Sequence, residues 1–437
     1  MNRNPDSKLD VAVVGGGAIG LCCAYALASR GARVTLFERN RCGEGASFGN
    51  AGWITPALSA PLPAPGAWRE VARAFQKDRP LRIAPRLDPA LLWWLVSFWR
   101  HSNASAYEVG ARAMLTLGAS SPESFSALQE SGVRFEMHET GLTFVALSDG
   151  ELAKHRKTFD NLTALGYSGE VVALSSAEAH ALEPALSGAT AGALQAVQER
   201  HVEPHSLTNG LRDACVQKGV RVLEHVEVKQ LEVRGRRIGL RLRERLLYPD
   251  AVIVAGGVWT RPLLARVAVK IPIESAKGYS VTVPGAPSVG RALYLSEARI
   301  GVTPFLESTR IAGTLELTGR DTSIAPRRIE SLEVATRRYL PGWKAEQGQR
   351  AWSGLRPLAP DGLPLIGRCS AYDNLYVATG HGMVGITLAP VTGEALAALI
   401  AGESRGVDLA PFTPDRFDSH SDRRSVNPVG KTLRSVR

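Results

Sequence analysis

Hydrophobic residues near the N-terminus occur in short runs that glycine and polar residues separate. Residues 11–14 form an apolar run typical of a buried strand, and it ends at three consecutive glycines, residues 15–17. Residues 18–29 have the composition of a helix, and the β-branched run at residues 33–37 predicts a second strand, which ends at Glu38. The pattern therefore predicts a strand, a glycine turn, a helix and a strand, followed by an acidic residue.

This order of elements is the context in which a G-x-G-x-x-G turn binds a dinucleotide. Gly15 would form the tight turn, Gly17 would let the backbone approach a pyrophosphate, and Gly20 would let helix and strand pack closely. The helix N-terminus would face the phosphates, and Glu38 would accept a hydrogen bond from a ribose hydroxyl and repel a 2′-phosphate. Glycine-rich turns also occur for structural reasons alone, but the full context favours a cofactor.

The segment after Glu38 is rich in small residues. It predicts a second backbone cradle over residues 43–52, with the Ser47 hydroxyl and the Asn50 amide as polar groups. The alternative interpretation is an ordinary surface loop. The cradle is favoured because the segment directly follows the acidic residue, where a long dinucleotide would continue across the sheet edge. Prolines at positions 56, 61, 63 and 65 then mark the end of the nucleotide-binding segment.

A strongly apolar helix is predicted at residues 87–100, which contain Trp93, Trp94 and Trp99. A core helix is the simpler interpretation. The alternative is an interfacial helix whose tryptophans lie at the level of lipid headgroups, with basic side chains nearby. Further helices are predicted at residues 106–129, 151–165, 176–182 and 325–339, and paired strands at residues 134–147.

Nucleotide-fold patterns return in the middle and near the end of the chain. A helix after Glu203 is followed by strands, and the buried strand at residues 251–255 ends at another glycine turn. A later strand leads into a glycine turn at residues 380–385 and a helix from about Ile386. Between these pieces, residues 271–317 predict consecutive strands of a separate antiparallel sheet. A cofactor that runs from adenine through pyrophosphate to a large redox ring explains three separated pieces, because its far end needs its own support.

The composition is that of a globular protein, with 437 residues of which 44% are hydrophobic and 22% charged. The net charge of +10 indicates attraction to an anionic membrane surface more than to nucleic acid, since no basic stretch alternates with stacking aromatic residues. The first ten residues lack the apolar segment of a signal peptide, and no run of about 18 apolar residues is present to span a bilayer. None of the five cysteines forms a C-x-x-C pair, which predicts a reducing cytoplasm and neither a disulfide framework nor a metal site.

Several motifs resemble those of the D-amino acid oxidase superfamily of FAD enzymes: GGGAIG with Glu38, ASFGNAGWITPALSAPLPAPG, AKGYS, RIAGTLEL, WSGLRPLAPDGLPLIG and TGHGMVG. Within it, the chain is most similar to the branch of bacterial D-amino acid dehydrogenase catalytic (small) subunits. The resemblance covers nearly the whole chain. It implies an α/β fold, with an FAD-binding Rossmann-like domain of the glutathione-reductase type and a second, antiparallel-sheet substrate domain. The FAD-binding domain would be discontinuous, over residues 9–58, 200–273 and 352–403, the substrate domain would take residues 59–199 and 274–351, and residues 411–437 would form a polar, disordered tail.

The resemblance also implies roles for individual residues. Arg356, in the GLRP motif, would pair bidentately with the substrate carboxylate in front of the flavin. His381 would belong to the flavin environment and would not act as a base, because hydride passes to flavin N5 in this superfamily without a dedicated side-chain base. Tyr279, Thr303 and Phe305 are candidates for substrate selectivity, with core packing of the antiparallel sheet as the alternative.

The same motifs predict the cofactor contacts. Backbone N–H groups at residues 382–386 would face the pyrimidine end of the flavin, where negative charge develops on reduction. No cysteine lies within residues 355–360, where sarcosine oxidase-like enzymes attach FAD, so non-covalent FAD is expected. Met383 stands where glycine oxidase-like enzymes carry a second arginine, which leaves Arg356 alone for the carboxylate. The predicted cofactor-binding residues are Gly15, Gly17, Ala18, Ile19, Gly20, Glu38, Arg39, Ser47, Asn50, Ala51, Gly52, Val228, Gly256, Gly257, Trp259, Gly354, Gly380, Gly382, Met383, Val384, Gly385, Ile386 and Thr387.

The function implied is FAD-dependent oxidative deamination of a small D-amino or D-imino acid, which gives a 2-oxo acid or a cyclic imine by hydride transfer from Cα to flavin N5. Electrons would pass to a quinone or another carrier. The protein would be cytoplasmic, with peripheral contact at the inner face of the cell membrane and no nucleic-acid partner. Two alternatives stay open: a glycine, sarcosine or D-hydroxyproline-type oxidase or dehydrogenase on the same scaffold, and a flavin-binding redox subunit without a substrate of its own.

Overall fold

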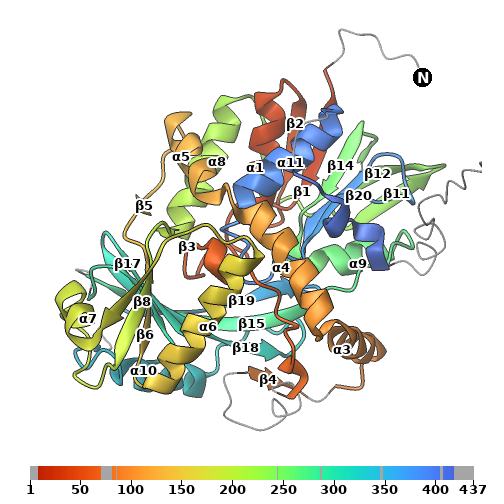
Figure 1. Ribbon diagram of the computed structural model, residues 1–437. Coiled ribbons are helices and arrows are strands. Elements are labelled where there is room, and N and C mark those ends of the chain that lie inside the picture. Colours follow the sequence, from red (N-terminus) through yellow and green to blue (C-terminus); the bar gives the residue numbers. More distant parts are fainter. Residues whose placement is uncertain are drawn as a thin grey trace, which may run out of the picture.

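The computed structural model describes residues 8–69, 81–84, 86–243, 245–285, 288–344, 348–403 and 407–417. Two large sheets lie side by side, and helices pack around them (Figure 1). The first sheet has six strands and is mostly parallel, and the second has nine strands. The fold is therefore of the mixed α/β kind that the sequence predicts.

The six-stranded sheet takes its strands from distant parts of the chain. Its order is β10-β2-β1-β14-β21-β20, and every neighbouring pair is parallel except β21 with β20. The strands are β1 (Asp10–Val14), β2 (Arg33–Phe37), β10 (Arg221–Leu223), β14 (Ala251–Val254), β20 (Leu365–Arg368) and β21 (Leu375–Thr379). The predicted strands at residues 11–14, 33–37 and 251–255 are confirmed. Parallel strands that are covered on both faces are expected to read as continuous apolar runs, as these do.

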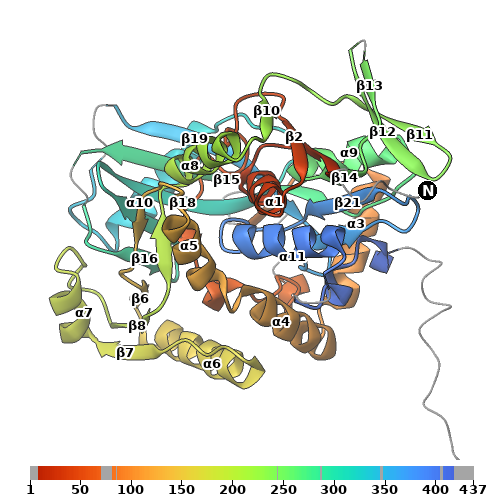
Figure 2. The same cartoon turned by 90° about the horizontal axis from the view of Figure 1, so that it is seen from above.

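Helices cover one face of this sheet, and a small sheet covers the other. α1 (Ala18–Ser29), α8 (Pro204–Gln217) and α11 (Ala389–Ala401) lie on the first face, where α1 and α11 are neighbours (Figure 2). Gly393 of α11 allows this close approach, because a Cβ there would lie 2.6 Å from the carbonyl carbon of Cys22. The other face carries α9 (Thr260–Ala265) and the three-stranded sheet of β11 (Gln230–Arg234), β12 (Arg237–Leu242) and β13 (Arg245–Leu247).

The nine-stranded sheet has the order β19-β15-β18-β17-β16-β6-β8-β7, with β4 beside β18. Its strands are β4 (Leu81–Ile83), β6 (Leu142–Ala146), β7 (Val171–Ser175), β8 (Gly192–Ala196), β15 (Glu274–Pro284), β16 (Ala292–Leu295), β17 (Ile300–Phe305), β18 (Ser308–Leu317) and β19 (Arg350–Leu358). The strands within residues 271–317 pair antiparallel with one another as predicted, and two further strands join them in parallel, β6 beside β16 and β4 beside β18. β6 and β4 come from earlier parts of the chain, so no tight turn joins them to β16 and β18 and forces an antiparallel pairing.

Helices from the middle of the chain pack on this second sheet and between the two sheets. They are α3 (Pro89–His101), α4 (Ala104–Gly118), α5 (Ser121–Glu130), α6 (Asp149–Leu165), α7 (Ser176–Leu182) and α10 (Pro326–Arg337). A third small sheet joins β3 (Trp53–Ile54), β9 (Arg200–Val202) and β5 (Met137–His138). Short 3₁₀ turns are η1 (Pro56–Leu58), η2 (Gly257–Trp259), η3 (Ala410–Phe412) and η4 (Pro414–Phe417).

Two predictions for the middle of the chain are wrong. Residues 106–129 form parts of two helices, α4 and α5, because Pro122 lacks a backbone N–H and stands in the first turn of a new helix. The strands within residues 134–147 do not pair with each other, since β5 pairs with β9 whereas β6 pairs with β8 and β16. Gly141, at φ +74°, lies between them and turns the chain from one sheet to the other.

Three predictions near the end of the chain also change. α11 begins at Ala389 and not near Ile386, with a proline in its first turn. Strand β19 pairs with β15, so residues 352–358 of the predicted FAD-binding segment lie in the second sheet. Residues 411–417 are not a free tail, because Phe412 is buried in the core and Arg416 Nε lies 2.7 Å from an Asp361 carboxylate oxygen. Residues 418–437 of the predicted tail are outside the described residues, and the other domain boundaries stay predictions.

Candidate active site

A cavity of about 460 Å³ lies at the carboxyl ends of the parallel strands β1, β2, β14 and β21, which is the usual ligand position in an open α/β sheet. The turns that follow these strands form most of its wall, and β19 of the second sheet adds residues 355–357. The predicted site residues in the wall are Gly15, Gly17, Ala18, Ile19, Glu38, Arg39, Ser47, Asn50, Val228, Gly256, Gly257, Trp259, Arg356, His381, Gly382, Met383, Gly385 and Ile386.

The glycine turn after β1 brings its backbone against the neighbouring strand. Gly15 has φ +113°, and a Cβ there would lie 2.5 Å from the carbonyl oxygen of Ala255. A Cβ on Gly20 would lie 1.9 Å from the Gly15 carbonyl oxygen, so both positions require glycine although Gly20 itself is behind the wall. The N–H of Ala18 donates to Ser47 Oγ at 3.0 Å, which ties the start of α1 to the next loop. The turn leaves bare backbone at a helix N-terminus, an arrangement suited to phosphate.

The acidic residue after β2 is held in one orientation at the cavity wall. The Glu38 carboxylate accepts hydrogen bonds from the N–H of Gly16 at 2.8 Å and of Asn40 at 2.9 Å. Each carboxylate oxygen keeps a further lone pair for a ligand hydroxyl. The adjacent Arg39 guanidinium lies 3.7 Å from the ring centroid of Trp259, and both residues line the cavity. This end of the cavity therefore offers the acceptor and the flat surface that an adenosine needs.

The loop between β2 and β3 is fixed by its own polar groups and by the second sheet. The Asn50 side chain accepts from the N–H of Gly52 at 2.7 Å and donates to the Ala46 carbonyl at 3.2 Å. Arg310 of β18 donates to the Asn50 carbonyl at 2.8 Å. Residues 43, 45, 46, 47 and 50 line the cavity, so the loop has the position of the predicted cradle.

Arg356 is the charged group that the second sheet presents to the cavity. Its guanidinium lies over Gly278 of the neighbouring strand, where a Cβ would be 2.1 Å from Arg356 Nη1, so glycine alone leaves room. Nη1 donates to the Thr314 carbonyl at 3.0 Å, and none of the described carboxylates pairs with the guanidinium. Burial lowers the pKa of Arg356 to about 10, so it remains charged at neutral pH. Its unused N–H donors form a planar fork that matches a carboxylate.

The backbone that receives Arg356 is strained. Thr314 has φ +64°, in the left-handed region that β-branched residues rarely adopt. It lies on β18 opposite the point where the β15–β18 register shifts, between Lys277 and Tyr279. An irregularity of this kind redirects backbone groups, and here the Thr314 carbonyl accepts from the guanidinium. Such strain concentrates at functional sites.

The turn after β21 closes the other end of the cavity. Burial lowers the pKa of His381 to about 3, so its imidazole is neutral at working pH. His381 Nε2 lies 3.0 Å from Thr392 Oγ1, a hydrogen bond that connects the turn to α11. The N–H of Gly382 donates to the Pro357 carbonyl at 2.9 Å and joins the same turn to β19. The turn and Arg356 are thus held in one fixed relation.

Nine predicted site residues lie outside the wall. Tyr279 is buried in the core of the nine-stranded sheet, and its hydroxyl donates to Glu316 at 3.1 Å. Thr303 accepts from Trp53 Nε1 at 2.9 Å and donates to the Ala51 carbonyl at 2.8 Å. Both side chains are satisfied inside the protein, so the structure favours the core-packing alternative for them. The nine residues are Gly20, Ala51, Gly52, Tyr279, Thr303, Gly354, Gly380, Val384 and Thr387.

Some of these residues support the wall from behind. The Thr387 hydroxyl donates to the Trp53 carbonyl and accepts from the Thr55 N–H, each at 3.0 Å, so it fastens β3 to the approach to α11. A Cβ on Gly354 would lie 2.0 Å from the ring of Trp352. The same ring lies against Gly49 and leaves no room for a Cβ there either. Phe305, the third selectivity candidate, is buried, with Arg310 4.9 Å from its ring centroid.

Sequence reasoning missed two kinds of wall residue. Some are direct neighbours of motif residues and could have been found by extending the motifs by one position, such as Asn40, Leu355, Pro357 and Thr379. Others come from α9, its flanks and the turn after β18, which carry no motif. These are Lys229, Pro262, Leu263, Arg266 and Arg320.

Three features together define a dinucleotide-binding oxidoreductase built on two sheets. They are the glycine turn of the parallel sheet, the acidic residue at the end of its second strand, and the cavity that reaches the second sheet. The chain belongs to the FAD dependent oxidoreductase family, whose model matches residues 10–399. The sequence-based assignment to this family and fold is confirmed, and the protein is an FAD-dependent oxidoreductase.

Named relatives cover nearly the full chain. It is 34% identical over 429 residues to D-amino acid dehydrogenase 2 of Ralstonia nicotianae, which covers 92% of this chain and 99% of the relative. It is 32% identical over 417 residues to D-amino acid dehydrogenase of Vibrio cholerae serotype O1, with 92% and 98% covered. Among solved structures, glycine oxidase from Geobacillus kaustophilus has a TM-score of 0.73 at 25% identity, over 94% of this chain and 99% of that one.

The residues present fit FAD. The cavity extends from Glu38 and Arg39, which suit an adenosine, past the bare backbone at Gly15 to the turn at His381 and the guanidinium of Arg356. A Cβ at Gly15 would collide with neighbouring backbone, so close approach to the chain is built into the wall. A long cofactor with a nucleotide at one end and a redox ring at the other matches this sequence of groups.

Gly278→Ala should displace the Arg356 guanidinium, because the added Cβ would occupy its place. We expect binding of a small carboxylate such as benzoate, followed through the absorbance of bound flavin, to weaken by at least about tenfold, the equivalent of 1.4 kcal/mol. FAD content should not change. Gly150→Ala is the matched control, since a Cβ there meets nothing within 4 Å. Unchanged carboxylate binding in a folded Gly278→Ala protein would contradict the assignment.

Proposed function

We propose that this protein oxidises the Cα–N bond of a small D-amino or D-imino acid, giving a 2-oxo acid after hydrolysis or a cyclic imine. The observation that carries the proposal is Arg356, a guanidinium in the cavity wall that no described carboxylate neutralises. The names of the relatives from Ralstonia nicotianae and Vibrio cholerae support the choice of D-amino acids. When bound, FAD supplies a two-electron acceptor for the hydride from the substrate Cα.

Arg356 would hold the substrate by its carboxylate. A planar guanidinium donates two parallel hydrogen bonds to a carboxylate, and it orients the rest of the molecule more strictly than a lysine would. The Thr314 carbonyl and the bare backbone of Gly278 fix the guanidinium before substrate arrives, so little reorganisation is needed on binding. Positioning is therefore the main catalytic contribution that we assign to the chain.

His381 would shape the cavity and take no part in proton transfer. Its pKa of about 3 leaves it unprotonated, and its Nε2 is engaged with Thr392. A general base works best with a pKa near the working pH. The N–H groups of Gly382 and Val384 already donate to the Pro357 and His381 carbonyls, so those of residues 383, 385 and 386 are the polar groups of this turn proposed to face the flavin.

FAD would be held without a covalent bond. The five cysteines, Cys22, Cys23, Cys42, Cys215 and Cys369, are all buried, and none of them is in a disulfide. None of them is among the residues that line the cavity. Burial raises the pKa of Cys23 and of Cys215 to about 12, which keeps these thiols protonated and unreactive.

Arg356→Ala tests the proposal directly. In an anaerobic titration with D-alanine, D-proline, hydroxyproline, sarcosine and glycine, the wild type should show bleaching of bound flavin by at least one D-amino or D-imino acid. The variant should keep FAD but lose kcat/KM by about a hundredfold or more, since a charged hydrogen-bonded pair is removed from a desolvated site. Arg236→Ala, on the exposed turn between β11 and β12, is the control. Reduction by sarcosine or glycine alone would favour the glycine or sarcosine-type alternative, and failure of every compound would favour a redox subunit without its own substrate.

Electrons would leave to a quinone or another carrier and not to oxygen. The dehydrogenase names of the relatives support this choice. We expect reduced protein to transfer electrons to a quinone analogue or dye much faster than to dissolved oxygen. Stopped-flow mixing of the reduced protein with each acceptor measures the two rates. Rapid release of hydrogen peroxide in air would identify an oxidase instead.

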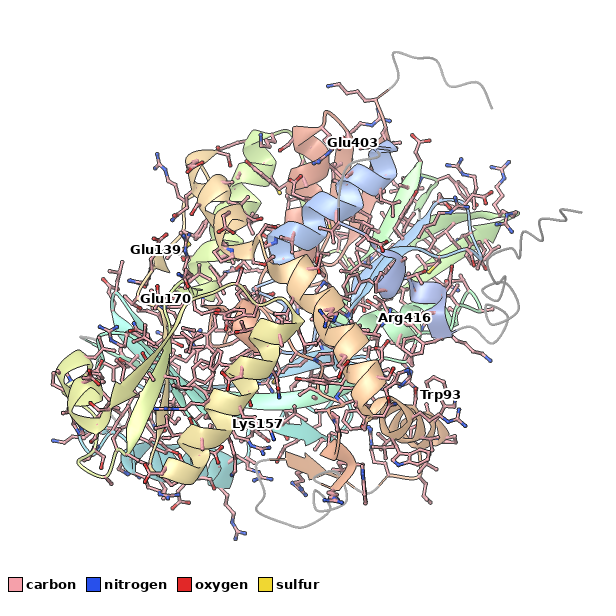
Figure 3. The ribbon with its side chains drawn as sticks, in the orientation of Figure 1. Trp93, Glu139, Lys157, Glu170, Glu403 and Arg416 are labelled. Carbon is pink, nitrogen blue, oxygen red and sulfur yellow. The ribbon has the colours of Figure 1, made fainter. Side chains whose placement is uncertain are left out.

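Helix α3 supports a peripheral contact with the membrane. Its inner side is core, because Trp94 and Phe98 are buried and Trp94 Nε1 donates to the Leu358 carbonyl at 3.1 Å. Its outer side carries apolar side chains that are about half exposed, with Trp93 at 50% and Trp99 at 61% (Figure 3). The inner side therefore has the character of a core helix, and the exposed apolar outer side supports the proposed membrane contact. Leu92 and Val96 complete the exposed apolar face.

The segment that contacts this face is followed in the sequence by basic residues. Phe417 contacts Trp93 edge to face, with ring centroids 6.4 Å apart, and the chain continues from there. Beyond it the sequence contains Arg423, Arg424, Lys431, Arg434 and Arg437 against two aspartates. Aromatic side chains beside basic residues suit a surface of anionic lipid. No helix in the described part of the chain has the length and apolar character to cross a membrane.

Replacing Trp93 and Trp99 by serine should reduce binding to vesicles that contain anionic lipid. The matched control replaces Val216 and Val334, which are similarly exposed on α8 and α10. Flotation with neutral and with anionic vesicles measures the bound fraction, and raised salt should lower it. Equal flotation of the two double variants would exclude α3 as the contact.

A further inference from the structure

A second cavity, of about 350 Å³, adjoins the first. Pro262 and Arg320 line both cavities, so the two spaces share a wall. The second cavity lies between the start of α3, helix α9, the first residues of β15 and the turn after β18. Its polar lining residues are Arg86, Asp88, Arg261, Glu274, Ser275 and Arg320.

The charges of the second cavity are not balanced. Glu274 is buried and pairs with two arginines, Arg86 at 3.0 Å and Arg261 at 3.6 Å. Asp88 uses its carboxylate to cap α3, accepting from the N–H of Ala90 at 3.0 Å. Arg320 has no carboxylate partner among the described residues. The cavity therefore holds one positive charge in excess of its acids.

Donor groups are also in excess. Arginine has five N–H donors and no acceptor, so three arginines greatly exceed what two carboxylates can accept. Arg86 Nε is buried and has no partner in the described part of the chain. A buried donor without an acceptor costs free energy, and an anionic oxygen would satisfy it. One bound carboxylate would supply both the missing charge and the missing acceptors.

Arg320 is exposed, but the backbone that carries it is firmly held. Ser275 Oγ donates to the Gly319 carbonyl at 2.6 Å, on one side of it. On the other side, Lys277 Nζ donates to the Asp321 carboxylate at 2.7 Å and to the Ser323 carbonyl at 3.1 Å. The buried Lys277 lowers the pKa of Asp321 to about 2, which keeps this pair ionised. The guanidinium of Arg320 is thus presented from a fixed point at the junction of the two cavities.

We propose that Arg320 and the second cavity form a subsite for a second carboxylate, so that the protein selects amino acids with an acidic side chain. The inference rests on the proposed function, in which Arg356 holds the α-carboxylate. Arg320 and Arg356 both line the first cavity, so we place the substrate between the two guanidinium groups, beside the space given to FAD. A single side-chain carboxylate balances the excess charge, whereas a doubly charged phosphate would not. Bidentate pairing again explains why the group is an arginine.

D-Glutamate and D-glutamine differ in charge and hardly in size, so they isolate the effect of the carboxylate. In the wild type, kcat/KM for flavin reduction should be higher for D-glutamate than for D-glutamine. Arg320→Gln should lower the ratio of kcat/KM for D-glutamate to kcat/KM for D-glutamine by about tenfold or more, a loss expected for one charged hydrogen-bonded pair. Arg320→Lys should recover part of the preference for D-glutamate over D-glutamine. Arg327→Gln, on the exposed side of α10, is the matched control.

The outcomes separate this inference from the proposed function. If D-alanine reduces the flavin but D-glutamate is no better than D-glutamine in wild type and in Arg320→Gln, the subsite is overturned and the proposed function stands. If no amino acid reduces the flavin, both are overturned. Glutarate as a competitor of D-alanine should lose affinity in Arg320→Gln and in Arg356→Ala. Glutarate binding that survives both substitutions would reveal an unrelated anion site and would also overturn the proposal.

Discussion

The guanidinium of Arg356, which no carboxylate of the described residues neutralises, is the constraint around which this structure is arranged. Removing an arginine from water without a counter-ion is unfavourable, and the lowered pKa of Arg356 records that cost. The fold offsets part of it with the Thr314 carbonyl and by clearing space over Gly278. The remaining donors are left for a ligand. A carboxylate that binds there gains a partner that is already partly buried and held in place, so less reorganisation is needed on binding.

The rest of the architecture keeps that guanidinium next to the mouth of a nucleotide fold. The carboxyl ends of four parallel strands provide the cavity, and their turns supply bare backbone where a phosphate can approach. The second sheet reaches the same cavity through β19 and through Arg320 in the turn after β18. Two hydrogen bonds hold the two sheets together at this point. The Gly382 N–H donates to the Pro357 carbonyl, and Arg310 donates to the Asn50 carbonyl. Each links a turn of the first sheet to a strand of the second, so the cofactor cavity and the charged group keep one fixed relation.

The nucleotide half of the site could be predicted from the sequence because its chemistry is local. Gly15, Gly17, Gly20 and Glu38 act through the backbone of one strand–turn–helix–strand unit, and spacing alone fixes their positions relative to each other. The selectivity roles of Tyr279 and Thr303 stay predictions, for the opposite reason. Alternation places a strand residue on one face of a sheet, but it does not say whether that face meets the cavity or the core, and both side chains face the core. Arg320 carries no sequence signal at all, since its proposed role depends on a turn held by Ser275 and Lys277 of another strand, β15.

The first residues of β15 explain why the two cavities depend on each other. Glu274 holds the two paired arginines of the second cavity, Ser275 and Lys277 fasten the turn of Arg320, and Gly278 makes room for Arg356. The register shift between Lys277 and Tyr279 lets residues 277 and 278 serve different neighbours within so short a stretch. One strand segment therefore sets the geometry of both guanidinium groups. A change in its backbone would therefore affect both guanidinium groups, because β15 contacts Arg356 directly and holds the turn that carries Arg320.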